Sequence, residues 1–251
     1  EPGQIVGLFG ENGAGKTTLM KCILKLLRCE GEIRLDGEPI TPKNITRISF
    51  ATNEHSFFPT LTAWSHREFY SEHFPKFNPK RFDALMDFFE LPKSRPVGKL
   101  STGQKNQFEV ILAVSQGADY ILMDEPFAGN DVFNREDFYK VLLGILEPHE
   151  TILLSTHLLE EVEPIISRAV LMHKGQIIGD VTTEELEKTG QSLMQYVKQS
   201  YNYRSDRVGK ALRELTGEEV RSSFGQATFF TATDGNHGRG VAWAANKLGQ
   251  K

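Results

Sequence analysis

The stretch Gly10–Thr18, with the sequence GENGAGKTT, decides the fold of this chain. It directly follows the apolar run Ile5–Phe9 (IVGLF), which is typical of a buried strand. After it, apolar residues of the segment Leu19–Leu26 recur at helical spacing, which predicts a helix with Leu26 on its apolar face. A glycine-rich loop between a strand and a helix, in the order G-x-x-x-x-G-K-[ST], predicts a site for phosphate groups.

Each residue type in this loop has a physical reason to be there. Gly10, Gly13 and Gly15 let the backbone turn tightly and bring its N–H groups close to a phosphate. Lys16 supplies a mobile positive charge for the terminal phosphates, and the Thr17 hydroxyl is suited to binding Mg²⁺. The following helix adds the positive end of its dipole. The alternative is a glycine turn that precedes a core helix by chance.

Length and composition place the chain among soluble globular proteins. It has 251 residues, of which 39% are hydrophobic and 25% charged, and both values are ordinary for that class. The net charge of −4 argues against extensive binding of nucleic acid. Cys22 and Cys29 are the two cysteines, too few to indicate a disulfide framework. We find no stretch long enough to span a bilayer and no signal peptide before the first strand, so any link to a membrane is expected to come through a partner.

Two carboxylates follow the apolar run Tyr120–Met123, which is a second predicted buried strand. Carboxylates at the end of a buried strand are costly unless a cation compensates them. We therefore expect Asp124 to face a Mg²⁺ ion held by Thr17, and Glu125 to orient or deprotonate a water molecule. The alternative is a strand that ends in a solvated acidic turn.

A second helix N-terminus suited to anions is predicted at Leu100–Gln104, with the sequence LSTGQ. Ser101 is a good N-cap, so Thr102 and Gly103 fall where a helix exposes free N–H groups. Taken alone this pattern is common.

The rest of the chain predicts a sheet with a helical insertion. Further strands are expected near Gly31–Gly37, at Ile45–Ala51 and at Thr151–Thr156, the last followed by His157 at the end where open parallel sheets bind ligands. The segment Leu61–Leu91 is rich in aromatic residues at helical spacing, and we expect most of them to lie in the core. A hairpin at about 169–178 closes the predicted sheet.

These pieces, in this order, resemble the ATP-binding subunit of an ABC transporter from about residue 3 to about residue 200. Residues 10–18 are similar to the Walker A loop, LSTGQ to the family signature, and residues 120–125 to Walker B with its glutamate. Residues 128–131 (AGND) are similar to the D-loop, and His157 to the switch histidine. The resemblance implies an α/β fold: a RecA-like P-loop core with an antiparallel β part and a helical subdomain at about residues 60–118.

The chain departs from the family pattern at two positions. Thr102 stands where the signature has a glycine, and Asn53 stands where the family has the Q-loop glutamine. Asparagine keeps the amide on a shorter arm. The chain also begins after the point where the family's adenine-stacking aromatic is expected, so the sequence does not predict how the base is recognised.

The resemblance implies ATP and Mg²⁺ as ligands and assigns residues to each. The residues implied in ATP binding are Gly10, Asn12, Gly13, Ala14, Gly15, Lys16, Thr17, Thr18, Asn53, Ser101, Gly103, Gln104 and Asp131. Thr17 and Asp124 are implied as the metal ligands, and Glu125 and His157 as the catalytic residues.

The resemblance also implies partners. Two ATPase subunits, identical or different, would associate head to tail, each ATP lying between one subunit's Walker A loop and the other's signature helix. The pair would drive a separate integral membrane permease from the cytoplasmic face of the membrane. The motif EPFAGND (residues 125–131) is most similar to small bacterial ABC-2-type or antibiotic-export ATPases. Alternatives are a soluble ABC-type switch in translation or repair, and an inert chain that binds nucleotide without productive dimerisation.

The sequence changes character after about residue 200. Residues 201–222 predict a helical extension or junction, and 223–251 predict a strand, a glycine-rich turn and a helix. The run TATDGNHGRGVAWAANKLGQK (residues 231–251) is similar to a loop of diaminopropionate ammonia-lyase, a pyridoxal-phosphate enzyme, with Asp234 at its base position. An isolated strand–helix unit cannot bury its own apolar face. We therefore expect a fragment without lyase activity; the alternatives are a native extension that is similar by accident, and a true pyridoxal-phosphate lyase.

Overall fold

The computed structural model describes residues 3–126 and 132–201. Its strands are β1 (Ile5–Phe9), β2 (Arg34–Leu35), β3 (Glu38–Pro39), β4 (Ile48–Thr52), β5 (Tyr120–Asp124), β6 (Thr151–Thr156), β7 (Arg168–His173) and β8 (Gln176–Thr182). Its helices are α1 (Lys16–Ile23), α2 (Ala63–His73), α3 (Pro79–Phe88), α4 (Thr102–Ser115), α5 (Val132–Ile145), α6 (Leu159–Val162), α7 (Thr183–Thr189) and α8 (Leu193–Ser200). Short 3₁₀ turns occupy Ile45–Arg47 and Val97–Lys99.

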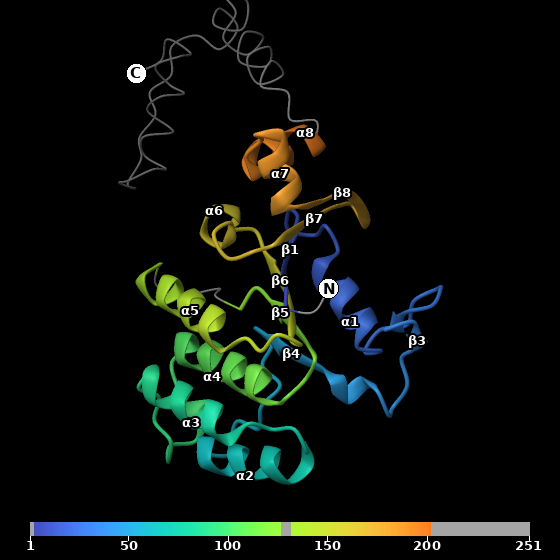
Figure 1. Ribbon diagram of the computed structural model, residues 1–251. Coiled ribbons are helices and arrows are strands. Elements are labelled where there is room, and N and C mark those ends of the chain that lie inside the picture. Colours follow the sequence, from blue (N-terminus) through green and yellow to red (C-terminus); the bar gives the residue numbers. More distant parts are fainter. Residues whose placement is uncertain (1–2, 127–131, 202–251) are drawn as a thin grey trace, which may run out of the picture. The chain divides into compact units, whose positions relative to one another are not determined.

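A six-stranded sheet in the order β4-β5-β6-β1-β7-β8 forms the centre of the described unit (Figure 1). The strands from β4 to β7 pair in parallel, and β8 pairs antiparallel with β7. The strand β1, which precedes the glycine loop, therefore lies between β6 and β7, buried on both sides. This confirms the predicted α/β architecture and the closing hairpin. The strands β2 and β3 form a separate two-stranded sheet.

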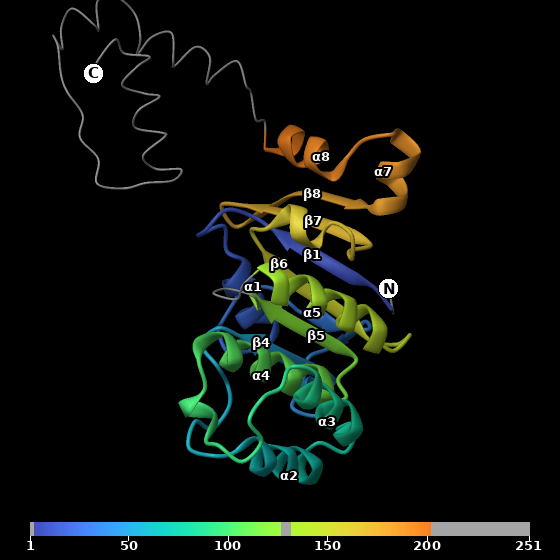
Figure 2. The same cartoon turned by 90° about the vertical axis from the view of Figure 1, so that its left-hand side faces the viewer.

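Alternate residues of the central strands face two separate cores. Leu8 and Leu122 pack with Met20 of α1, whereas Ile121 and Met123 pack with the helices on the opposite face. The helix α1 accordingly covers one face of the sheet, and α4 and α5 cover the other (Figures 1 and 2). The apolar runs in these strands are continuous because both faces of a parallel sheet are covered.

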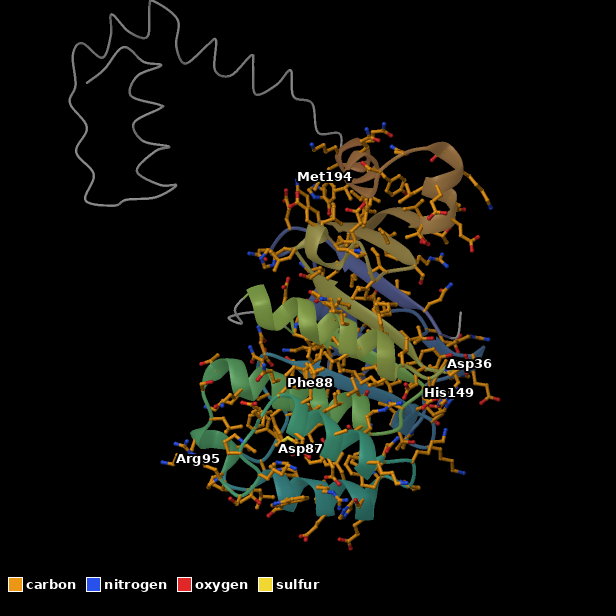
Figure 3. The ribbon with its side chains drawn as sticks, turned by 60° about the vertical axis from the view of Figure 1, so that its left-hand side comes forward. Asp36, Asp87, Phe88, Arg95, His149 and Met194 are labelled. Carbon is orange, nitrogen blue, oxygen red and sulfur yellow. The ribbon has the colours of Figure 1, made fainter. Side chains whose placement is uncertain are left out.

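The aromatic insertion forms a helical layer, α2 and α3, that packs on α4 (Figure 2). Phe77 and Phe82 of the insertion are buried beside Phe108 of α4, and Tyr70, Phe74 and Phe89 are partly buried against the same core. Trp64 and Phe88 are exceptions, with 42% and 53% of their surface exposed. Figure 3 shows Phe88 on this helical layer and Met194, in α8, at the opposite end of the unit.

The first helix is shorter than its sequence pattern predicts. It ends at Ile23, and Leu26, expected on the apolar face, lies beyond the helix with 64% of its surface exposed. Lys25 has a φ of 59°, and the N–H of Leu26 bonds to the carbonyl of Lys21, which closes a turn. A residue in the left-handed conformation ends an α-helix. The prediction that Leu26 lies on the apolar face of the helix was therefore wrong.

Some of the predictions lie outside the described residues. These are Asp131 with the D-loop, the junction at 202–222 and the segment 223–251. Within the two described ranges, no helix is both long enough and apolar enough to cross a membrane.

Candidate active site

The glycine-rich loop is wrapped around the ammonium group of Lys16. This side chain is 7% exposed and donates hydrogen bonds to the carbonyls of Gly10 at 2.8 Å and Glu11 at 3.3 Å. Gly15 has a φ of 106° at the N-cap of α1, a conformation open mainly to glycine. The charge is thus held at the helix N-terminus, among the backbone groups expected to bind phosphate.

Close packing also fixes glycine at position 10. A Cβ at Gly10 would lie 2.5 Å from the carbonyl oxygen of Met172 and 2.9 Å from the Cβ of Ala14. Ala14 is buried, and its carbonyl accepts a hydrogen bond of 2.8 Å from the N–H of Gly175. The end of β7 and the β7–β8 turn therefore pack against the glycine-rich loop. Asn12 and Thr18 are exposed.

Thr17 and Asp124, which the sequence predicts to be ligands of one metal ion, are in direct contact. The Thr17 hydroxyl donates a 2.6 Å hydrogen bond to Oδ2 of Asp124, whose surface is 3% exposed. The hydroxyl of Ser155 donates to the other oxygen, Oδ1. Ser155 lies opposite Asp124 in the pairing of β5 with β6. Sequence reasoning missed Ser155; the polar end of a predicted strand was the available signal.

The donor set suits a hard cation. A hydroxyl and a carboxylate oxygen in contact are ligands of the type Mg²⁺ prefers, and these two residues would hold such an ion. Among the described residues, no group of three or more His, Cys, Asp or Glu side chains could hold a metal by itself. The pair Thr17 and Asp124 thus fits an ion that arrives with a phosphate ligand.

Glu125 and His157 form a second pair beside the first. Both carboxylate oxygens of Glu125 lie within hydrogen-bond distance of His157 Nδ1, at 3.0 and 3.1 Å. Glu125 has a φ of 46°, and its backbone N–H donates to the carbonyl of Ser155 at 3.1 Å. A non-glycine residue in this region is strained, and such strain gathers at functional sites. The imidazole is 52% exposed, so it is accessible to a substrate.

Asn53, which aligns with the Q-loop glutamine, lies near Glu125. Both line a narrow crevice that Asn106 and Glu109 of α4 also line. Asn53 directly follows β4, and Thr52 of that strand pairs with Asp124 of β5. Adjacent parallel strands therefore carry Asn53 and Glu125 to the same edge of the sheet.

The signature residues begin α4. Ser101 is the N-cap: its hydroxyl accepts from the N–H of Gln104 at 3.3 Å, and Gln104 Oε1 accepts from the N–H of Ser101 at 3.1 Å. Ser101 is exposed and Gly103 is partly exposed, so the helix N-terminus is accessible. Because α4 and α1 cover opposite faces of the sheet, Ser101 and Gly103 are not part of the cluster around Lys16 (Figure 1).

The fold and this cluster together define a P-loop nucleoside triphosphatase. A family model described as "ABC transporter" matches residues 1–128. The chain is 29% identical over 218 residues to the ABC transporter ATP-binding protein YtrB of Bacillus subtilis, which covers 85% of this chain and 72% of that protein. It is also 29% identical over 210 residues to the lipopolysaccharide export system ATP-binding protein LptB of Haemophilus influenzae. That alignment covers 79% of this chain and 87% of LptB.

A solved structure titled "Structure of ATP binding subunit of ABC transporter" has the same fold. It superposes with a TM-score of 0.69 at 23% identity, over 80% of this chain and 88% of that one. The chain belongs to the ABC transporter family as an ATP-binding subunit, the ATPase that energises a membrane permease. This sets aside the alternative of a soluble switch.

Proposed function

We propose that the chain binds Mg²⁺–ATP on the Gly10–Thr18 loop and hydrolyses it with Glu125, and that the site is completed by a second ATPase subunit. The contact between Thr17 and Asp124 carries this proposal, because it places two oxygen ligands beside the charge of Lys16. Gly10, Gly13 and Gly15 shape the loop for its N–H groups to face the phosphates, with Asn12, Ala14 and Thr18 alongside.

Lys16 exchanges its present carbonyl partners for the terminal phosphates of ATP. Its ammonium now bonds to the carbonyls of Gly10 and Glu11, so the charge is already positioned before substrate arrives. Thr17 and Asp124 hold Mg²⁺, which when bound neutralises charge on the phosphates. Ser155 fixes the orientation of the Asp124 carboxylate by donating to Oδ1, the oxygen that Thr17 does not contact.

Glu125 acts as general base toward the attacking water. Its hydrogen bond to His157 orients the carboxylate, and we assign His157 a contact with the γ-phosphate. The Asn53 amide lines the same crevice as Glu125 and would help to orient the attacking water.

The exposed N-terminus of α4 binds the ATP held by a partner subunit. Ser101 and Gln104 hold this end in its capped form through their reciprocal hydrogen bonds, so Gly103 between them and the positive end of the helix dipole are presented to an anion, on the face of the sheet opposite the loop. A head-to-tail dimer, of identical or different subunits and with Asp131 at its interface, brings such an end to each ATP.

We propose that the chain is the ATPase subunit of an exporter and that it acts at the cytoplasmic face of the membrane. The EPFAGND motif supports this class, as does the similarity to a relative that is itself named as part of an export system. Nucleic acid is not expected as a partner, given the net charge of −4.

We propose that residues 223–251 are a fragment similar to the lyase, without lyase activity, and that residues 201–222 join this fragment to the ATPase part of the chain. An absorbance scan of the purified chain tests this. A coloured, borohydride-reducible cofactor would contradict it. The relatives reported above are transporter ATPases and give the lyase resemblance no support.

The central experiment compares Glu125→Gln with Lys16→Ala. Loss of the general base is expected to lower turnover by about 100-fold or more, while ATP still binds and the ATP-bound dimer accumulates in light scattering. Lys16→Ala is expected to lose ATP binding and the dimer together. Near-normal turnover in Glu125→Gln would remove this residue from its role.

A further inference from the structure

The loop that follows β4 is held by two helices on opposite faces of the sheet. The ammonium of Lys21, in α1, lies 2.8 Å from the carboxylate of Glu54. On the other side, His55 Nε2 is 2.8 Å from Oδ1 of Asn106 in α4. Asn53 immediately precedes these contacts, so its position depends on how the loop is held.

The strongest of these attachments is a buried carboxylate of α4. Glu109 is 2% exposed. The N–H of Ser56 donates to its two oxygens at 2.9 and 3.0 Å, and the Ser56 hydroxyl donates to Oε1 at 2.7 Å. Hydrogen bonds to a charged acceptor are stronger than neutral ones, and a buried carboxylate without them is very costly.

Burial raises the pKa of Glu109, and the hydrogen bonds from Ser56 act in the opposite direction. The neighbours of Glu109 along the helix, Phe108 and Val110, are fully buried. A carboxylate in such surroundings needs donors, and Ser56 of the loop after β4 supplies them through its N–H and its hydroxyl.

The helix that carries Glu109 begins at the capped Ser101 end, about two turns away. Since a helix moves as a rigid element, Glu109 couples the loop of Asn53 to the signature end. The same crevice includes Glu125.

We propose that Glu109 is a positioning residue that fixes the short-armed Asn53 beside Glu125 and ties it to the signature helix. This rests on the proposed function, because it assigns Asn53 a part in hydrolysis. Glu109 itself touches neither ATP nor water in this role; it acts through the loop.

The test measures kcat, the KM for ATP and nucleotide binding in Glu109→Ala and Glu109→Gln. We expect Glu109→Ala to lower kcat about ten-fold, since small misplacement of a reacting group is costly, with little change in ATP binding by the P-loop. Glutamine keeps an oxygen that accepts from Ser56, so Glu109→Gln is expected to restore most of the kcat. The exposed Glu187 provides the matched control, Glu187→Ala, with unchanged kinetics.

A double-mutant cycle with Asn53→Ala separates positioning from a general structural role. If Glu109 acts through Asn53, Glu109→Ala has no further effect on kcat in the Asn53→Ala background. Additive losses, or a wild-type kcat in Glu109→Ala, would overturn the proposal. Should Glu109→Ala not fold, Ser56→Ala replaces it in the cycle, because it removes the 2.7 Å bond from an exposed residue. A wild-type chain without ATPase activity would instead contradict the proposed function.

Discussion

The Thr17 hydroxyl donates a 2.6 Å hydrogen bond to Oδ2 of Asp124, a residue 107 positions further along the chain. The strand order produces this contact, because β1 leads into the loop of Thr17 and β5 ends at Asp124. Ser155 completes the arrangement from β6, which lies between those strands. Three separate stretches of sequence therefore supply one oxygen-lined position.

Ser155→Ala is expected to weaken the response to Mg²⁺ without removing a metal ligand. The Ser155 hydroxyl orients Asp124, and loss of such a supporting bond typically costs about 10- to 100-fold in metal affinity or activity. A titration of ATPase activity against Mg²⁺ at fixed ATP measures the shift. Ser71→Ala, at an exposed position of α2, is the control. An unchanged Mg²⁺ midpoint in Ser155→Ala would contradict the role assigned to this hydroxyl.

Gly10→Ala is expected to disturb the loop by overpacking. The new Cβ would lie 2.5 Å from a backbone carbonyl oxygen that cannot easily move. Overpacking of this kind costs about 1–3 kcal/mol of stability, and we expect ATP binding to weaken with it. Urea unfolding and nucleotide titration measure both effects. Gly144→Ala in α5 is the matched control, because a Cβ there meets nothing within 4 Å. Equal stability of the two variants would contradict the argument.

The ion pair between Arg81 and Glu150 is expected to fasten the helical layer to the sheet. Arg81 of α3 is 8% exposed in its side chain and donates to Glu150 and to the carbonyl of Val114, both at 2.7 Å, and to that of Ile145 at 2.8 Å. Arg81→Met leaves a buried carboxylate unpaired, which costs about 3–5 kcal/mol.

The double variant Arg81→Met/Glu150→Gln is expected to recover part of that loss, since the unpaired charge is gone. Urea unfolding of the wild type, both single variants and the double variant measures the coupling. Losses that simply add would show that the two side chains do not act as a pair.

His66 is expected to make stability depend on pH. It is fully buried, its Nε2 accepts from the N–H of Phe58 at 3.0 Å, and Nδ1 donates to the carbonyl of Thr62 at 2.8 Å. Burial lowers the pKa of His66 below the ordinary value of 6.5. The unfolded chain then takes up a proton before the folded chain does, so stability is full above about pH 6.5 and falls as the pH drops below it.

Urea unfolding at pH 7.5 and at pH 5.5 measures this loss. His66→Gln removes the titrating group, so the variant should lose less stability over the same interval. His73→Gln, at an exposed position of α2, is the control and should behave as the wild type. A pH dependence that is the same in His66→Gln and the wild type would contradict the assignment.

Local patterns were predictable where short-range chemistry decides the structure. The strand–loop–helix around Lys16 was identified because glycine, lysine and threonine at fixed spacing have few other uses. The N-cap at Ser101 was identified for a similar reason, and the structure confirms it. The prediction of where α1 ends was wrong, because Lys25 adopts a left-handed conformation that stops the helix before the apolar periodicity ends.

Apart from Thr17 and Asp124, whose motifs predicted that they lie close together, long-range neighbours were not predictable from local patterns. Glu109 is a charged residue inside an apolar helix, which marks it as unusual, yet nothing in the sequence shows that Ser56 is its partner. Ser155 reads as an ordinary strand-end serine until β5 and β6 are placed side by side.

The sequence alone determined that this chain carries a phosphate-binding loop and an Asp–Glu pair, because those functions depend on residues a few positions apart. The sequence also predicted that Asp124 lies near Thr17, but only the tertiary structure decided that Ser155 donates to Asp124 and that Asn53 shares a crevice with Glu125. The physical reason is that strand order and helix packing, set by burial of two apolar faces, bring distant residues together.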